Sequence, residues 1–205
     1  NKEIIYYFLG FFFFFSAFNI LRNVINYYVV IIMKQSTGAV TLISAIIFGF
    51  AAIFFPITNK LTKLFGFKKM MLVNLSSIIF GTVGLIIFKN SNLMIIYTFY
   101  AIIGTGISGA AFIFPPAMLS EISTSIASKS GVSVEGLLFG IQGFFLKLAF
   151  MVQAIISISA LVYNSVANAN GLKSASYDGV ILSLIISIFM FILSMIFYTM
   201  KKNEI

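Results

Sequence analysis

Long apolar stretches run along the whole chain, and short segments that carry most of the charges separate them. An α-helix needs about 20 apolar residues to cross the hydrocarbon core of a bilayer, and each stretch has roughly this length or more. The short alternating segments that are typical of membrane β-strands do not occur. The pattern therefore predicts six membrane-spanning helices, over residues 4–33, 40–58, 71–88, 93–117, 135–164 and 180–200.

The composition favours a chain that is embedded in the lipid bilayer over its whole length. Of its 205 residues, 60% are hydrophobic and only 9% are charged, whereas a soluble domain has about 25% charged residues. This excludes a soluble globular enzyme, and the six spans leave no room for a soluble domain. We therefore expect an all-α integral membrane protein in which residues 1–205 form a single six-helix domain.

The chain offers little that could carry out a chemical reaction. It contains no His and no Cys, which removes imidazole proton relays, thiolate chemistry and two common kinds of metal ligand. No motif indicates a nucleophile with its base, a phosphate-binding loop or a metal cluster. We expect a protein that is not an enzyme and binds no metal or cofactor. The net charge of +8 does not indicate a nucleic-acid partner, because the basic residues are dispersed between apolar runs.

The basic residues between the spans divide unequally between the two sides of the membrane. Eight lie in the termini and in the segments 59–70 and 120–134, whereas three lie in the opposite connections. The positive-inside rule therefore places both termini of this segment in the cytoplasm, for a multi-pass protein of the inner (cell) membrane. The first group is Lys2, Lys60, Lys63, Lys68, Lys69, Lys129, Lys201 and Lys202, and the second is Lys34, Lys89 and Lys173.

Arg22 and Lys147 are the two cations inside predicted spans. A cation near the centre of a bilayer costs about 2.5–3.5 kcal/mol, so it normally faces a partner or a water-filled cavity. Arg22 could instead extend to the outer interface, and Lys147 could pair with another helix. The one acid in these spans, Glu135, is the first residue of the fifth span, and no acid lies near the middle of a span. We therefore expect the partner to be an acid of another polypeptide segment, or an anionic or hydroxyl-rich ligand.

Amide side chains accompany both cations. In the first span they form one helical face with Arg22, at the spacing i, i+3, i+4 and i+7. Such a face suits the recognition of hydroxyl or carboxylate groups, and it suits hydrogen bonding between helices equally well. The face consists of Asn19, Arg22, Asn23 and Asn26, and the amides that flank Lys147 are Gln142 and Gln153.

Other patterns predict structural roles. Gly104 and Ser108 form a small-xxx-small pair, which predicts close packing of the fourth span on another helix. The run of phenylalanines at 11–15 predicts a lipid-facing surface, and the Ser-rich segment 120–134 predicts a cytoplasmic loop.

Four stretches together resemble one transporter family. They are FNILRNVINYY at 18–28, FFP with NKLTKLFGFKK within 54–69, PPAMLSEISTSIASKSGVSVEG at 115–136, and Glu135 followed twelve residues later by Lys147. Their order resembles helices 7–12, the C-terminal half, of a major facilitator superfamily (MFS) transporter. The resemblance is strongest to the glycoside–pentoside–hexuronide:cation symporters, the melibiose permease-like family.

The resemblance implies one half of a secondary active transporter that moves a sugar or glycoside with a cation by alternating access. It implies that the N-terminal six-helix half, absent from this chain, is a partner and holds the Na⁺ or H⁺ site. The resemblance makes Lys147 a pathway residue. Together with the polar residues described above, the expected solute and ion pathway comprises Lys147, Arg22, Asn19, Asn23, Asn26, Tyr27, Gln142 and Gln153. The cytoplasmic gate that it implies comprises Glu121, Lys129, Glu135, Lys60, Lys63, Gly66, Lys68 and Lys69.

Two alternatives stay open on the sequence. One is an MFS exporter or a carrier of another small metabolite, such as an organic acid attracted by Arg22 and Lys147. The other is of a different class, a six-helix channel or a membrane scaffold subunit that assembles with copies of itself. The chain begins with Asn1 rather than Met, so we expect it to be part of a longer protein. Six further spans before it would favour the transporter.

Overall fold

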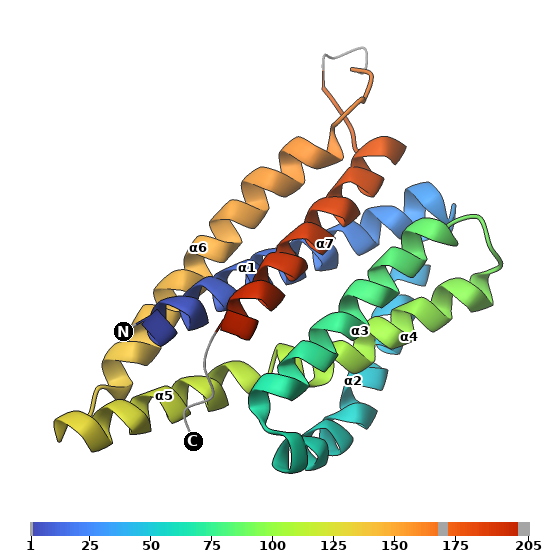
Figure 1. The fold of residues 1–205 in the computed structure, drawn as a ribbon. Coiled ribbons are helices and arrows are strands. Elements are labelled where there is room, and N and C mark those ends of the chain that lie inside the picture. The colour runs from blue at the N-terminus through green and yellow to red at the C-terminus, as the bar shows by residue number, and fades with distance from the viewer. Residues whose placement is uncertain (1, 168–171, 201–205) are drawn as a thin grey trace.

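The computed structural model describes residues 2–167 and 172–200, and helices account for most of them. The extended pairing in this part of the chain is one isolated bridge, between Ala167 and Lys173. Figure 1 shows the helices as an elongated bundle. They are α1 (Lys2–Tyr27), the π-helical turn η1 (Tyr28–Ile32), α2 (Thr37–Phe65), α3 (Phe67–Ile87), α4 (Leu93–Ala110), α5 (Phe114–Ser130), α6 (Glu135–Leu161) and α7 (Tyr177–Met200).

Six helical segments of the described residues are long and apolar enough to cross a membrane, which confirms the predicted all-helical fold with six spans. α4 and α5 together form one of these segments, because the helix is interrupted only at 111–113. Pro115 lies in the first turn of α5, where a missing N–H is tolerated. Further inside a continuous helix it would remove a backbone hydrogen bond and clash with the preceding turn, which explains why the interruption lies here.

The second and third spans are joined by a sharp turn, not by the loop that the sequence predicted over 59–70. α2 continues to Phe65 and α3 begins at Phe67, which leaves only Gly66 between them. The backbone of Gly66 has a φ of 81°, a conformation that glycine adopts at little cost. The prediction was wrong because lysines extend their charged ends toward water from a helix that leaves the bilayer.

α5 occupies most of the segment 120–134, which was predicted as a cytoplasmic loop. The helix runs to Ser130 and ends where Gly131 takes a left-handed conformation, with a φ of 72°, as is common at helix C-termini. Hydroxyls of α5 bond to carbonyls of their own helix, as Ser130 does to Ile126 at 2.9 Å. The prediction was wrong because this bonding satisfies serines within a helix.

The six membrane-spanning helices pack as two groups of three, and neither group is continuous in sequence. α1 packs mainly on α7 and α6, whereas α4 packs mainly on α3 and α2. The first helix of each three-helix stretch therefore lies against the last two helices of the other stretch, and α3 and α7 join the groups. Figure 1 shows α1, α6 and α7 on one side of the bundle and α2, α3 and α4 on the other.

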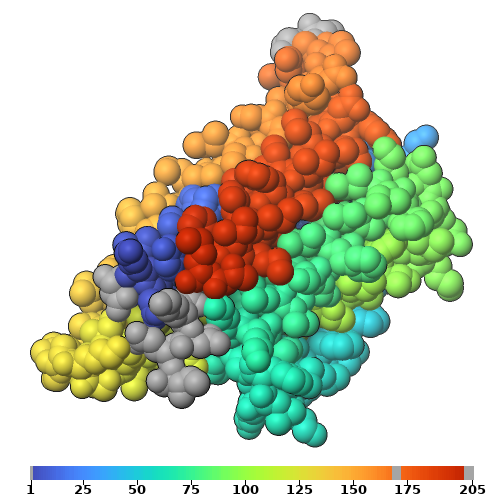
Figure 2. Space-filling view, in the orientation of Figure 1, coloured from blue at the N-terminus to red at the C-terminus, as the bar shows by residue number. Residues whose placement is uncertain are grey.

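Hydrogen bonds show which helix ends lie together at each end of the bundle. At one end, the Lys68 ammonium donates to the carbonyl oxygen of Thr199 on α7 at 2.9 Å. At the other end, the Tyr28 hydroxyl donates to the carbonyl oxygen of Leu85 on α3 at 2.7 Å. Figure 2 shows α5 and the described part of the α6–α7 loop projecting at opposite ends. Connections therefore alternate between the ends, and which end faces the cytoplasm stays a prediction.

Small residues let α4 approach two neighbouring helices as closely as their backbones allow. A Cβ atom on Gly106 would lie 2.5 Å from the carbonyl oxygen of Asn74 on α3. A Cβ atom on Gly104 would collide with the carbonyl oxygen of Ile47 on α2. The predicted close packing of the fourth span is confirmed, and it fixes α4 against both helices.

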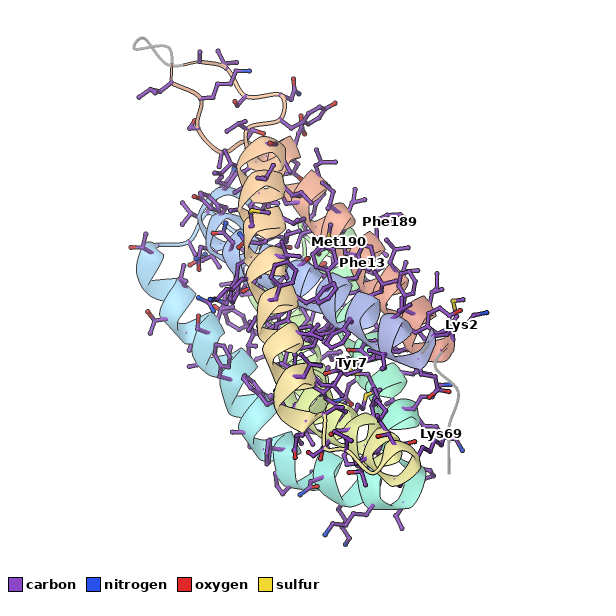
Figure 3. The ribbon with its side chains drawn as sticks, turned by 90° about the vertical axis from the view of Figure 1, so that its left-hand side faces the viewer. Lys2, Tyr7, Phe13, Lys69, Phe189 and Met190 are labelled. Carbon is purple, nitrogen blue, oxygen red and sulfur yellow. The ribbon has the colours of Figure 1, made fainter. Side chains whose placement is uncertain are left out.

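The phenylalanines at 11–15 take part in packing between helices. Phe14 is fully buried, and Phe13 stacks on Phe197 of α7 with ring centroids 5.6 Å apart and planes within 4°. Figure 3 shows Phe13 where α1 lies alongside α7. The prediction of a lipid-facing surface was wrong because α1 lies against both α6 and α7, and a helix that is apolar on all sides is typical of a buried position.

α2 and α6 are the least covered of the membrane-spanning helices. In the most apolar part of each span, 17% of α2 and 22% of α6 is buried, compared with 61% for the span that begins with α1. Their uncovered faces are therefore available to lipid or to another protein segment.

Candidate functional site

A cavity lies where α1, α2 and α4 meet. Its volume is about 330 Å³, near the lower end of the range of about 300–1,000 Å³ that is usual for small-molecule sites. Most of its lining is apolar, and Arg22, Asn26 and Ser44 supply the polar side chains. The lining residues are Phe18, Leu21, Arg22, Ile25, Asn26, Ser44, Ile47, Phe48, Ile103 and Ile107.

The cavity lies at the middle depth of the helices. Arg22 is about 10 residues, or roughly 15 Å, before the end of η1 at Ile32. Ile107 is about 14 residues, or roughly 21 Å, after the start of α4 at Leu93. Both distances place the cavity well inside a hydrocarbon core about 30 Å thick. A solute in this cavity would therefore be far from either membrane surface.

Local helix geometry brings the lining residues together. α1 is a regular α-helix as far as Tyr27, so Arg22 and Asn26, four residues apart, lie one turn apart on the same face. The glycine contact between α4 and α2 described above places Ile107 beside Ile47 in the lining. The apolar walls and the polar face of α1 therefore both follow from regular helices in close contact.

Arg22 carries a positive charge that no neighbour balances. Its guanidinium has no hydrogen-bond or ion-pair partner among the residues that the structure describes, and no acid belongs to the cavity lining. A guanidinium stays protonated in proteins and presents a planar fork of N–H donors. The cavity therefore suits a group that accepts several hydrogen bonds, and a negative charge would suit it best.

The predicted polar face of the first span is divided in the structure. Arg22 and Asn26 line the cavity, whereas Asn19 is buried and donates from Nδ2 to the carbonyl oxygen of Phe15 at 2.7 Å. Asn23 is half-buried and does not belong to the lining. Successive residues of a helix differ by about 100° in direction, so the stripe is wide enough for its two edges to meet different surroundings.

A second cavity of about 360 Å³ adjoins the first on the side of the α6–α7 loop. Its polar lining comes from Asn26 and Tyr27 on α1, Thr37 on α2 and Ser174 in the loop. Asn26 belongs to both cavities. The predicted pathway residue Tyr27 therefore lies in a space that leads from the loop toward Arg22.

Lys147 lies on an exposed face of α6 that also carries Gly140 and Gly143. It is about 12 residues, or roughly 18 Å, from Glu135 at the start of α6, so it is also at middle depth. It lines neither of the two cavities, and its ammonium has no partner in the described part of the chain. The structure therefore does not bring Lys147 and Arg22 into one cavity, and the pathway role of Lys147 stays a prediction.

Gln142 takes part in a buried chain of hydrogen bonds that the sequence did not indicate. Gln142 donates from Nε2 to the Tyr7 hydroxyl at 2.6 Å, and Tyr7 donates to the carbonyl oxygen of Pro115 at 2.7 Å. The chain joins α6, α1 and α5, and Figure 3 shows Tyr7 on α1 near the ends of those two helices. The other flanking amide, Gln153, donates to Ser157 Oγ one turn later at 3.2 Å.

The residues predicted for a cytoplasmic gate lie near helix ends. Lys68 donates to Thr199 as described above, and this bond connects the start of α3 with the end of α7. Glu135 lies in the first turn of α6, where a negative charge is favourable. The remaining gate residues are all exposed: Lys60 and Lys63 on α2, Gly66 at the turn, Lys69 on α3, and Glu121 and Lys129 on α5.

Comparison with known proteins shows which family the sequence of this chain matches. A family model described as "MFS/sugar transport protein" matches residues 1–202, which is nearly the whole chain. No curated protein and no solved structure gives a significant match. The match therefore covers all six spans and all the residues that line the two cavities.

Proposed function

The chain belongs to the MFS/sugar transport protein family, and from this premise we propose that it is one half of a sugar or glycoside:cation symporter. The family and the six spans make it a multi-pass membrane protein of a transporter family. The proposal adds three points to this. The solute is a sugar or a glycoside, its movement is coupled to a cation, and the two halves alternate between inward-open and outward-open arrangements.

The family match over residues 1–202 carries the proposal. Many secondary transporters consist of repeated helical halves, with the solute near the midplane where the repeats meet. The cavity of about 330 Å³ at middle depth is in keeping with such a site. The poorly covered faces of α2 and α6 are in keeping with a second half that packs on them. In this proposal Arg22, Asn26 and Ser44 contact the solute.

The coupling ion belongs to the other half in this proposal. Among the described residues, no group of three or more Asp, Glu, His or Cys side chains is gathered. Lys147 would act at the boundary between the halves, where an acid of the second half balances its charge in one of the two arrangements. Both ends of this segment face the cytoplasm of an inner (cell) membrane protein, as its lysine distribution favours.

Uptake by the full-length protein in proteoliposomes tests the proposal. Galactosides, pentosides and hexuronates are offered under a Na⁺ gradient, under a H⁺ gradient and without a gradient. We expect at least one of them to accumulate above its external concentration only when a cation gradient is present. Equilibration without accumulation would contradict symport, and a steady ion current with no solute uptake would favour the six-helix channel.

Substitution of Lys147 by Ala should abolish accumulation of the solute while the protein still reaches the membrane. The reason is that a cation at middle depth with no partner among the described residues is costly unless it takes part in function. The matched control is Lys89→Ala, which removes a lysine at the α3–α4 turn, where its Nζ lies 4.9 Å from the Tyr177 ring centroid. Normal accumulation by Lys147→Ala would contradict the assigned role.

Single cysteines test the proposed orientation. In a cysteine-free background, an impermeant maleimide should label Lys89→Cys in intact cells and Lys63→Cys only after the cells are opened. The two positions lie at opposite ends of the bundle, at the α3–α4 turn and near the end of α2. The reverse labelling pattern would place the termini of this segment outside.

A further inference from the structure

Arg22 is the charged residue in the lining of the cavity between α1, α2 and α4. It lies at middle depth, lines the cavity, and has no hydrogen-bond or ion-pair partner among the described residues. The other two polar lining residues, Asn26 and Ser44, are neutral. Nothing in the lining therefore balances the guanidinium charge.

The helices that form the cavity are also poor in acids. α2 and α4 contain no Asp or Glu, and the acid of α1 is Glu3. Glu3 is about 19 residues from Arg22 along the helix, or roughly 28 Å. A rotamer change of Arg22 cannot bridge this distance, so the balancing charge must come from outside these three helices.

A neutral solute would leave this charge uncompensated. Sugar hydroxyls can be bound by amides and hydroxyls such as Asn26 and Ser44. The Arg22 side chain is exposed to the cavity rather than buried in protein, but a cation at this depth of a membrane is costly when nothing balances its charge. A carboxylate or a phosphate repays that cost, because it accepts two parallel hydrogen bonds from the planar guanidinium. An arginine at position 22 therefore favours an acidic solute over a neutral one.

Resting on the transport function proposed above, we propose that the solute carries a carboxylate or phosphate group, and that Arg22 binds this group in the cavity. Asn26, one turn further along α1, and Ser44 on α2 then bind hydroxyls of the same molecule. The solute class is accordingly a sugar acid or a sugar phosphate rather than a neutral sugar.

Three probes that share one ring test this inference: glucose, glucuronate and glucose 6-phosphate. The full-length protein is purified in detergent, and the rise of its Tm is titrated with each probe at constant ionic strength, since a ligand that binds the native state raises Tm. Glucuronate or glucose 6-phosphate should bind about tenfold to hundredfold more tightly than glucose. Which of the two binds separates carboxylate from phosphate recognition.

Variants assign the effect to Arg22. Arg22→Gln should bring the affinity for the acidic probe down to that for glucose, and Arg22→Lys should keep part of the preference, because it retains the charge and loses the planar fork. Lys89→Gln, which removes one positive charge at the α3–α4 turn, should keep the full preference. An acid preference that survives in Arg22→Gln, equal binding of all three probes, or no binding of an acidic probe overturns the inference.

The same preparations distinguish this inference from the proposed transport function. Proteoliposome uptake of a neutral sugar without any preference for acids would support transport and overturn the inference. An acid preference that depends on Arg22, together with no uptake of any probe, would support the inference and contradict transport. If Arg22→Gln lowers the Tm of the ligand-free protein strongly and leaves the binding ratio unchanged, Arg22 pairs with an acid of another segment, and the inference is overturned.

Discussion

Polar side chains in the two parts of α1 differ in whether they have hydrogen-bond partners among the described residues. Near its start, Tyr7 is fully buried, accepts a hydrogen bond from Gln142 and donates one to the carbonyl oxygen of Pro115. About four turns later, Arg22 and Asn26 line a cavity and have no hydrogen-bond partner among the described residues. One helix therefore contains both a satisfied polar site and an unsatisfied one.

This difference separates polar residues that stabilise the fold from polar residues that are available to bind another molecule. A polar group at membrane depth is costly unless something satisfies it. For Tyr7 the partners are in the chain, so its removal should affect stability. Arg22 has no partner among the described residues, so its removal should affect binding and leave stability almost unchanged. Three substitutions test this contrast.

Substitution of Tyr7 by Ala should have the largest effect on stability. It removes a fully buried ring that contacts Tyr198 and Phe8 together with both hydrogen bonds of the hydroxyl. We expect a loss of about 2–3 kcal/mol in the free energy of unfolding, at the low end for aromatic truncations because lipid is itself apolar. Unfolding in mixed micelles measures it, and Tyr6→Ala on the same helix is the control.

Tyr7→Phe removes the hydroxyl and keeps the ring. The Pro115 carbonyl oxygen and the Gln142 amide then lose a buried partner. We expect a loss of about 1 kcal/mol, as is usual for hydrogen bonds between membrane helices. Tyr6→Phe, which removes a hydroxyl that has no partner among the described residues, should be neutral in the same assay. Equal losses in both variants would show that the hydrogen-bond chain does not stabilise the fold.

Arg22→Gln should have the smallest effect on stability, within about 0.5 kcal/mol of the unsubstituted protein. The guanidinium makes no contact with a partner in the described residues that the substitution could break. The measurement is the same unfolding assay without solute. A loss as large as that of Tyr7→Phe would remove the contrast between the two parts of α1 and make Arg22 a structural residue.

The spans could be predicted from the sequence, and their ends could not. Six apolar runs are long enough to require membrane helices, whatever their neighbours. The helix ends depend on local backbone chemistry instead. Polar residues before Gly66 and Gly131 suggested loops, yet both helices continue to these glycines, whose positive φ ends them. Charge is a good signal for where the bilayer stops and a poor one for where a helix stops.

The candidate site could be predicted in part for a similar reason. Arg22 and Asn26 are conspicuous because polar side chains are rare in an apolar helix, and the structure places both at the cavity. Gln142 is equally conspicuous, and the structure gives it a partner in Tyr7. The two cases differ only in what lies opposite each side chain. That partner is 135 residues away in sequence, so spacing along one helix carries no information about it.

The π-helical turn η1, which follows the cavity-lining part of α1, is a place where the chain can gain or lose a residue. Within it, the N–H of Met33 bonds to the carbonyl oxygen of Tyr28, five residues earlier, at 3.0 Å. Such a turn holds one residue more than an α-helical turn. Loss of one residue there would restore the narrower turn, and Arg22, which precedes the turn in the regular part of α1, would keep its direction. The connection from η1 to α2 can therefore gain or lose a residue in evolution without turning the guanidinium away from the cavity.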